Sequence, residues 1–369
     1  MQALRQILQE DLTVVAGVSS LGERKAQGWN EIDSSFFDFC ILPKTGWWKF
    51  ATNLIKETSE GVHLFGGIFA DKRFFLLMLY CKIKGIKFAL MSEPYAETAV
   101  GYFRDHSPFF PKIKLYLRPL IYRLAGFFLG RELFAFFPIS EMASTQFRRN
   151  GFRSAAIYPF GYFVPKSSSL PSTSLVAASL SVTRIIFVGN LIRRKGIHIL
   201  LDAWRECQHH INNPKVQMML DIYGTGEIDE RDLPLNAYVR GPIPFGHAQS
   251  VMAQYDALIL PSLHDGWGVV VNEALLQGVP ALVSDRVGAQ ALVKAANAGA
   301  VFKADSVTAL VELFVRIADD PLQLKDWANG ARKLADSLEP SAGADYLLAC
   351  LEHADRGVGP APTPPWTGV

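Results

Sequence analysis

Two carboxylates eight positions apart flank a short glycine turn in the second half of the chain. Asp265 stands before Gly266-Trp267-Gly268, and Glu273 follows on a stretch with helical spacing. A glycine turn that opens a helix leaves backbone N–H groups without partners at the positive end of the helix dipole, which favours phosphate. Ionised carboxylates beside such a turn can accept hydrogen bonds from hydroxyls. These residue types therefore predict a site for a phosphorylated sugar.

The residues around this turn predict a strand, a helix and a second strand. The apolar run 257–260 ends at Pro261, and the stretch 269–277 is expected to be a helix that Gly278 closes at its C′ position. Residues 281–283 form the next expected strand. Such a βαβ unit is typical of a parallel sheet.

The same alternation of strands and helices runs through the whole chain, and it predicts an α/β protein with two Rossmann-like domains. The expected strands are 12–16, 36–42, 61–67, 86–91, 134–140, 184–189, 217–223, 257–260, 281–283 and 299–302. A Ser- and Pro-rich stretch separates the two halves, and the end of the chain is rich in Pro and Gly. The expected parts are an N-terminal domain at 1–165, a linker at 166–182, a second domain at 183–340, a C-terminal helix at 341–356 and a disordered tail at 357–369.

Charge is distributed unevenly along the 369 residues. The formal charge is +7 over residues 1–166 and −5 over the remainder. A basic first half indicates an acidic partner, such as a phospholipid surface or an anionic glycan, or else a solvated surface with no partner. The four cysteines are far apart and form no C-x-x-C pair, which favours a reduced, cytoplasmic chain. We find no signal peptide, and no apolar run reaches the roughly 20 residues that span a bilayer.

Aromatic and basic residues alternate over residues 95–131. This composition predicts an amphipathic helix that makes a peripheral membrane contact. The alternative is a helix whose apolar side faces the core and whose basic side is solvated. We expect no nucleic-acid partner, because no recognition module accompanies the basic residues.

Three motifs in the second half, FVGNLIRRKG, YGTG and YDALILPSLHDGWGVVVNEALLQGVPALVSD, occur in an order that resembles the retaining glycosyltransferases of family 4. The resemblance covers about 184–320, and the first half matches more loosely at SEPY, FPISEMASTQFRRNGF and IYPFGYF. It implies the GT-B fold, in which two Rossmann-like domains face a cleft. Family members begin with a strand where this chain begins with a helix, so we expect the first domain to lack its opening strand.

The resemblance also implies an activity. The protein would be a metal-independent transferase of the hexosyltransferase type that needs no cofactor. It would move a sugar, with retention, from a UDP-, GDP- or ADP-linked donor to an acceptor in polysaccharide or lipid-linked envelope glycan synthesis. We expect it in the cytoplasm, at the inner face of the cell membrane.

Individual donor-site residues follow from the same resemblance. Lys195 matches the lysine that contacts the donor diphosphate, and Glu273 matches the glutamate that holds the ribose. Asp265 stands where the family has a second glutamate, which holds the transferred sugar. Asn190 replaces a usual arginine, so Arg193 or Arg194 is expected to take over that phosphate contact. The remaining donor-side residues are expected to be Gly189, Tyr223, Gly224, Gly226, Arg240, Gly241, Pro242 and the backbone amides of Gly266, Trp267 and Gly268.

Acceptor-side residues are expected at the strand ends of the first domain. Glu93 stands where many members have a histidine near the reaction centre, and we expect a polar group or base there. The alternative for Glu93 is a capping or solvated acid. His106 is a weaker candidate, and Gly66 and Gly67 either line the acceptor cleft or end a strand.

Two further functions remain open at this stage. A catalytically inactive GT-B-fold binding protein would explain a missing opening strand. A sugar-nucleotide epimerase could share the fold, although the Asp265–Glu273 block and the RRKG loop favour a transferase.

Overall fold

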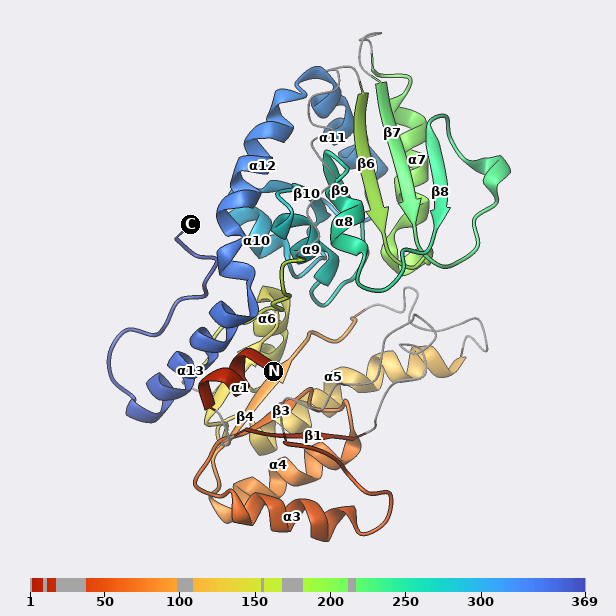
Figure 1. Ribbon diagram of the computed structural model, residues 1–369. Coiled ribbons are helices and arrows are strands. Elements are labelled where there is room, and N and C mark those ends of the chain that lie inside the picture. Colours follow the sequence, from red (N-terminus) through yellow and green to blue (C-terminus); the bar gives the residue numbers. More distant parts are fainter. Residues whose placement is uncertain are drawn as a thin grey trace. The chain divides into compact units, whose positions relative to one another are not determined.

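The structure, a computed structural model, describes residues 2–8, 12–17, 38–97, 109–153, 156–167, 182–211 and 217–368. The chain forms two compact units (Figure 1). The first comprises Met1–Tyr95, Ile113–Gly161 and Pro340–Pro365, and the second Ala96–Lys112, Tyr162–Glu339 and Trp366–Val369. Most of the expected linker at 166–182 lies outside the described residues.

The first unit contains two parallel sheets. Strand β1 (Thr13–Ala16) pairs with β2 (Asp38–Ile41), and a three-stranded sheet has the order β3 (His63–Gly66), β4 (Phe88–Ser92), β5 (Ala135–Pro138). Its helices are α1 (Gln2–Leu8), α3 (Trp47–Glu57), α4 (Lys72–Lys84), α5 (Phe109–Leu129), α6 (Glu141–Arg149) and α13 (Pro340–Arg356). The expected strands and helices of the first half are thereby confirmed, with small shifts at their ends.

Short-range interactions set the helix ends in this unit. At the start of α4 the Asp71 carboxylate accepts the Arg73 N–H at 2.9 Å, and Gly85 ends the helix with a φ of 67°. At the start of α6 the Ser140 hydroxyl oxygen accepts the Ala143 N–H at 3.3 Å. Both are the caps that Asp, Ser and Gly provide.

Helix α13 completes the first unit, although it comes late in the sequence. The Tyr346 hydroxyl donates to the Pro159 carbonyl at 3.0 Å, and its ring stacks on Phe160. The Tyr158 hydroxyl lies 2.7 Å from His353 Nδ1. The separate C-terminal helix expected at 341–356 is therefore part of the first unit's core.

The second unit is built on one parallel six-stranded sheet of order β11-β10-β9-β6-β7-β8. These strands are β6 (Val182–Val188), β7 (Gln217–Tyr223), β8 (Ala237–Gly241), β9 (Ala257–Leu260), β10 (Ala281–Ser284) and β11 (Gly299–Phe302). Its helices are α7 (Ile197–Cys207), α8 (Ala248–Met252), α9 (Val269–Leu276), α10 (Gln290–Ala295), α11 (Val307–Asp319) and α12 (Leu322–Leu334), with short 3-10 turns at Arg193–Lys195, Glu230–Asp232 and Asp336–Leu338. All five strands expected in this half are confirmed.

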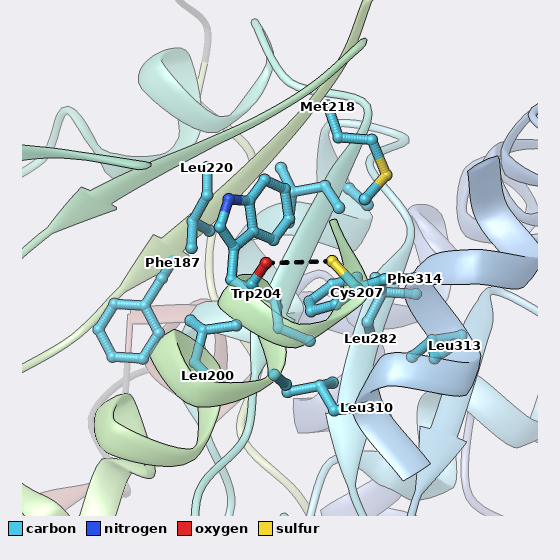
Figure 2. Packing of buried hydrophobic residues seen from close by; sticks show 14 of the residues in the cluster. Phe187, Leu200, Trp204, Cys207, Met218, Leu220, Leu282, Leu310, Leu313 and Phe314 are labelled. Carbon is cyan, nitrogen blue, oxygen red and sulfur yellow. Dashed lines mark hydrogen bonds between the residues drawn. The ribbon is translucent and has the colours of Figure 1, made fainter. Parts of the chain in front are cut away.

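A hydrophobic core fills the space between this sheet and the helices α7 and α11 (Figure 2). Phe187, Leu220 and Trp204 are essentially inaccessible to solvent. The Trp204 ring meets Phe314 edge-on at 5.1 Å, and its indole N–H donates to the Leu235 carbonyl at 3.1 Å. The core thus holds the strands whose ends carry the glycine and lysine motifs.

The tail at 357–369 differs from its expected disorder. Residues 357–368 are described, and Trp366 is only 5% exposed. Its ring lies near the rings of Trp267 and Phe163. The packing of the Trp366 side chain therefore contributes to the order of a segment whose composition alone favours disorder.

Candidate donor-binding site

The order of the strands in the second unit creates a switch point between β6 and β9. From β6 the chain proceeds to β7 and β8 on one side, and β9, β10 and β11 lie on the other. Ligands of open parallel sheets bind outside the carboxyl ends of the strands at such a point. The loops that follow β6 and β9 here are 189–196 and 261–268, which carry the RRKG motif and the Asp265 turn.

The loop after β6 packs directly on the loop after β9. Gly196 has a φ of 72°, and a Cβ atom there would lie 1.9 Å from the Pro261 carbonyl oxygen. Only glycine permits this approach and this backbone conformation. The Leu263 N–H donates to the Arg194 carbonyl at 2.8 Å, and Arg194 Nη1 donates to the His264 carbonyl at 3.1 Å. The two loops are therefore joined by backbone contacts.

This packing brings Lys195 and Asp265 together. Lys195 Nζ lies 2.5 Å from Asp265 Oδ2, and the side chains are 16% and 13% exposed. The pair is a charge-assisted hydrogen bond that is largely shielded from solvent. An anion that binds Lys195 must therefore share the ammonium group with the Asp265 carboxylate or displace it.

The main chain of the Asp265 turn is fixed by the loop after β10. The Asp265 N–H donates to the Arg286 carbonyl at 2.9 Å, and the Gly288 N–H donates back to the Asp265 carbonyl at 3.1 Å. The Ala289 N–H donates to the Trp267 carbonyl at 2.8 Å. The turn is thus preorganised by three hydrogen bonds that use its own backbone.

Helix α9 begins at the end of this turn, as expected. Gly268 precedes it with a φ of 91°. Within the described part of the chain, the N–H groups of Gly266, Trp267 and Gly268 have no hydrogen-bond acceptor. Such amides before a helix form an anion site. The Trp267 indole is buried and donates to Asn272 Oδ1 at 2.7 Å, so this residue can contact a ligand through its main chain alone.

The far end of α9 confirms the predicted stop. The Gly278 N–H donates to the Leu275 carbonyl and the Val279 N–H to the Ala274 carbonyl, which is a Schellman motif with Gly278 at C′. Glu273 lies between these ends and is partly buried. Its carboxyl makes no hydrogen bond or ion pair with any residue of the described ranges, and burial raises its pKa to about 7. A carboxyl with an unused acceptor and a raised pKa is a candidate functional group.

The two arginines of the basic loop differ in their surroundings. Arg194 is held at the His264 carbonyl, whereas Arg193 is exposed and forms no ion pair with a described residue. Asn190, where the arginine of related motifs is missing, accepts a hydrogen bond from Thr225 Oγ1 at 3.1 Å through its Oδ1. Arg193 is thus the arginine that remains available for the phosphate contact.

The glycines of the YGTG motif are required by packing against the loop after β6. A Cβ atom at Gly224 would lie 1.8 Å from the Gly189 carbonyl oxygen, and one at Gly226 would lie 2.7 Å from the Leu191 Cβ. The Leu191 N–H also donates to the Thr225 carbonyl at 2.8 Å. These contacts place Gly189, Gly224 and Gly226 together at the carboxyl edge of the sheet.

The side chains expected next to the nucleotide base belong to a polar network. Arg240 Nε donates to Asp221 Oδ1 at 2.8 Å, and the Tyr255 hydroxyl donates to Asp221 Oδ2 at 2.7 Å. The Tyr223 and Tyr255 hydroxyls are 3.2 Å apart. Asp221 is 1% exposed, so Arg240 compensates a buried charge. Beyond Arg240, Gly241 and the exposed Pro242 continue from the end of β8.

Sequence reasoning missed Asp221 and Tyr255. The signal was present in the run QMMLDIY, because a carboxylate inside an otherwise apolar buried strand needs a cationic or hydroxyl partner. The partner could not be identified from the sequence, since Arg240 and Tyr255 come from other elements.

The expected acceptor-side residues lie in the first unit. Gly66 ends β3 opposite Met91, and the Gly67 N–H donates to the Met91 carbonyl at 2.7 Å. Glu93 is exposed and directly follows β4. These three residues gather at the carboxyl edge of one sheet, as expected. His106 lies outside the described residues.

Over the ranges that the structure describes, no group of three or more His, Cys, Asp and Glu side chains gathers in a way that could hold a metal ion.

The second unit matches a family of known proteins. The model of the family "Glycosyl transferases group 1" matches residues 180–334. Over 187 residues the chain is 26% identical to D-inositol 3-phosphate glycosyltransferase 1 of Catenulispora acidiphila. The match covers 47% of this chain and 44% of that relative, so the chain aligns with less than half of the relative's length.

Solved structures resemble the chain over more of its length. HepE of Anabaena, in a crystal structure with UDP and glucose, has a TM-score of 0.64 and 16% identity over 94% of this chain and 93% of its own. WaaG, a glycosyltransferase involved in lipopolysaccharide biosynthesis, has a TM-score of 0.57 and 17% identity over 98% and 95%. At these identities the likeness shows the fold, which is the GT-B fold with two Rossmann-like units.

Proposed function

We propose that this chain, whose residues 180–334 match the model of the glycosyl transferases group 1 family, transfers a sugar from a nucleotide-diphosphate donor to an acceptor. The observation that carries the proposal is the Lys195–Asp265 pair at the switch point, beside the unpaired amides of the turn before α9. In this assignment Lys195, Arg193 and the turn amides bind the diphosphate. Glu273 accepts a hydrogen bond from the ribose, and Asp265 holds the transferred sugar.

Donor binding would then begin with an exchange of partners. The diphosphate forms an ion pair with the Lys195 ammonium group. The Asp265 carboxylate then becomes free to accept hydrogen bonds from sugar hydroxyls. The binding of the two halves of the donor is thereby coupled, because either half alone leaves one member of a shielded ion pair without its partner.

The proposed reaction is a substitution with retention. The bond between the anomeric carbon and the phosphate oxygen breaks, and its electron pair goes to the diphosphate. The acceptor hydroxyl attacks from the same face, and its proton passes to the departing phosphate oxygen. Lys195, Arg193 and the amides before α9 stabilise the leaving-group charge.

The proposed acceptor is a polysaccharide or lipid-linked envelope glycan, with Glu93, Gly66 and Gly67 on the acceptor side. Support comes from helix α5. Its exposed apolar side chains recur at helical spacing on one stripe, whereas Ala125 and Leu129 on another side are buried. The stripe consists of Leu117, Leu120, Ile121, Leu124, Phe127 and Phe128.

Basic residues accompany this stripe, namely Arg118, Arg123 and Arg131. A contiguous exposed apolar stripe on a basic helix fits the interface of an anionic membrane. No helix in the described ranges is long and apolar enough to cross a bilayer. We therefore include a peripheral membrane contact through α5 in the proposal.

A thermal-shift screen with UDP, GDP and ADP tests the donor side, because a ligand of the native state raises its stability by mass action. Transfer from the matching nucleotide sugar is then measured for the wild type and for Glu273→Ala. Full transfer by Glu273→Ala would contradict the assignment. Stabilisation by a nucleotide without any transfer would favour an inactive binding protein, and conversion of the nucleotide sugar without an acceptor would favour an epimerase.

A further inference from the structure

A tryptophan near the end of the sequence, Trp366, packs on the turn Gly266-Trp267-Gly268 of the second unit. The ring of Trp366 lies 5.9 Å from that of Trp267 and 6.0 Å from that of Phe163, and Trp366 is 5% exposed. Trp267 is the middle residue of the turn Gly266-Trp267-Gly268, which directly follows Asp265. A side chain near the end of the sequence therefore touches the turn that carries the acid of the Lys195–Asp265 pair.

The indole of Trp267 is fixed on several sides. Its N–H donates to Asn272 Oδ1 at 2.7 Å, and Asn272 Nδ2 donates to the Tyr162 carbonyl at 2.8 Å. The Tyr162 ring meets the indole edge-on at 6.5 Å. Trp366 supplies a further aromatic contact. Its removal would leave a cavity of indole size beside Trp267, and a core next to a cavity relaxes toward it.

Movement of Trp267 would be transmitted to Asp265 through the backbone. Only one residue separates them, and the same turn is held by the Ala289 N–H at the Trp267 carbonyl and the Gly288 N–H at the Asp265 carbonyl. A reacting group displaced by about 1 Å can lose about a hundredfold in rate. Small shifts of the indole therefore matter for the geometry at Lys195.

We propose that Trp366 is a positioning residue: by closing the aromatic cluster around Trp267, it holds the Asp265 turn in the geometry that receives the donor diphosphate. The proposal rests on the proposed function for the identity of the ligand. The positioning of the turn itself is a property of the protein without nucleotide.

Hydrogen–deuterium exchange on the full-length protein tests the positioning directly. The reporters are the amides of Asp265, Gly288 and Ala289, which are hydrogen-bonded within the turn and its neighbouring loop. We expect Trp366→Ala to raise their exchange by about tenfold or more, since local opening free energies govern exchange. Trp366→Phe keeps an aromatic ring and should stay close to the wild type.

A matched control separates positioning from general destabilisation. Trp204 is also deeply buried, in the core of the same unit (Figure 2), but its hydrogen bond and its ring contact are made with Leu235 and Phe314 and not with the turn. Trp204→Phe removes its hydrogen bond to the Leu235 carbonyl and should lower the unfolding temperature. It should leave exchange at the three reporter amides unchanged.

Titration with UDP as the probe completes the test. We expect about tenfold weaker UDP binding for Trp366→Ala, little change for Trp366→Phe, and none for Trp204→Phe. Unchanged exchange at the reporters in Trp366→Ala, or faster exchange with unaltered UDP affinity, would overturn the positioning role. A wild-type protein that bound no UDP would count against a UDP donor in the proposed function, and the exchange result would still decide whether Trp366 holds the turn.

Discussion

The Lys195–Asp265 pair joins two residues that the proposed function assigns to different parts of the donor. Each residue neutralises the other, so removal of either one changes the ligand preference of the partner. A substitution at Asp265 and one at Lys195 should therefore have opposite effects on the binding of a nucleoside diphosphate.

Asp265→Asn should strengthen UDP binding by about threefold to tenfold, because Lys195 no longer shares its charge, while transfer falls by about a hundredfold or more. Lys195→Ala should weaken both UDP binding and transfer. Isothermal titration and initial rates measure the two effects. The exposed Lys333→Ala controls for the loss of a positive charge. Weaker UDP binding by Asp265→Asn would contradict the exchange of partners.

Glu273 provides a prediction on pH. Burial raises its pKa from 4.5 to about 7, so the folded state binds this proton more tightly than the unfolded state does. The corresponding stabilisation is complete below the unfolded pKa and is lost as the pH rises through about 7. Glu273→Gln stays neutral, so its gain in unfolding free energy over the wild type should grow between pH 5 and pH 8, by at most about 3 kcal/mol.

Denaturant unfolding at several pH values, followed in the second unit, measures this difference. Glu312→Gln, at a solvent-exposed acid of α11 in the same unit, controls for the replacement of a carboxyl group by an amide. A pH-independent difference for Glu273→Gln would contradict a raised pKa in the folded protein.

The sequence indicated which residues belong to the candidate site, but it did not indicate which of them contact one another. Asp265 and Glu273 were expected from their spacing around the glycine turn, and Lys195 from the resemblance to the family. Their pairing was not, because it depends on the fit of Gly196 against Pro261, which come from different loops. Arg240 shows the same limit, since its partner Asp221 lies on a neighbouring strand.

At the scale of elements, two loops carry the proposed donor site, and the packing of a single glycine sets the distance between them. Gly196 combines a left-handed backbone with a carbonyl oxygen 1.9 Å from the position of a Cβ atom. Gly196→Ala should therefore destabilise the second unit by about 2 kcal/mol or more and separate Lys195 from Asp265.

Gly246 is a matched control for this substitution. Its φ is 83°, but a Cβ atom there would meet nothing within 4 Å. Gly246→Ala should thus show the cost of the backbone conformation alone, about 1 kcal/mol, and retain UDP binding. Thermal unfolding and UDP titration of both variants give the comparison. Equal losses of UDP affinity would show that the Pro261 contact is not what positions Lys195.

Helix α5 is the element on which the proposed membrane contact can be tested. Phe127 is 80% exposed, and Phe127→Ser together with Leu124→Ser should reduce sedimentation with phosphatidylglycerol-containing vesicles several-fold, because apolar burial drives interfacial binding. Leu235 is 72% exposed in the second unit, and Leu235→Ser should leave sedimentation unchanged. Vesicles of phosphatidylcholine alone carry no net charge, so the difference in sedimentation between the two vesicle types measures how much lipid charge contributes to binding. Equal binding by the double variant would contradict a role for α5.

Elements were predictable wherever local signals agreed with the fold. Gly278 ends α9 in a Schellman motif, and Ser140 caps α6, both as their residue types indicate. It was harder to predict from the sequence which strands pair with one another. The first unit divides into β1-β2 and β3-β4-β5, a separation that depends on contacts between distant segments and leaves no local signal.

At the scale of the whole molecule, sequence order and spatial grouping differ at the C-terminal end. Helix α13 follows the second unit in sequence but packs in the first, and Trp366 returns to the second. The sequence predicted a C-terminal helix at 341–356 and a disordered tail, and it did not indicate to which unit either belongs, because spacing and composition report only local preference. The buried side chains of Tyr346, in α13, and of Trp366, in the tail, pack on residues far away in the sequence, and composition does not report such contacts.

This grouping predicts that a substitution in α13 weakens the first unit and spares the proposed donor site in the second. Tyr346 is 5% exposed, stacks on Phe160 and donates to the Pro159 carbonyl, so Tyr346→Ala should cost about 3 kcal/mol through lost burial and an unpaired carbonyl. Amide hydrogen–deuterium exchange of Tyr346→Ala should rise in residues 63–92 and stay unchanged in residues 257–284. The variant should retain its affinity for UDP. Phe314→Ala, in the core of the second unit, should give the reverse pattern. Equal loss of protection in both ranges for Tyr346→Ala would mean that the two units unfold together, and the assignment of α13 to the first unit's stability would then be wrong.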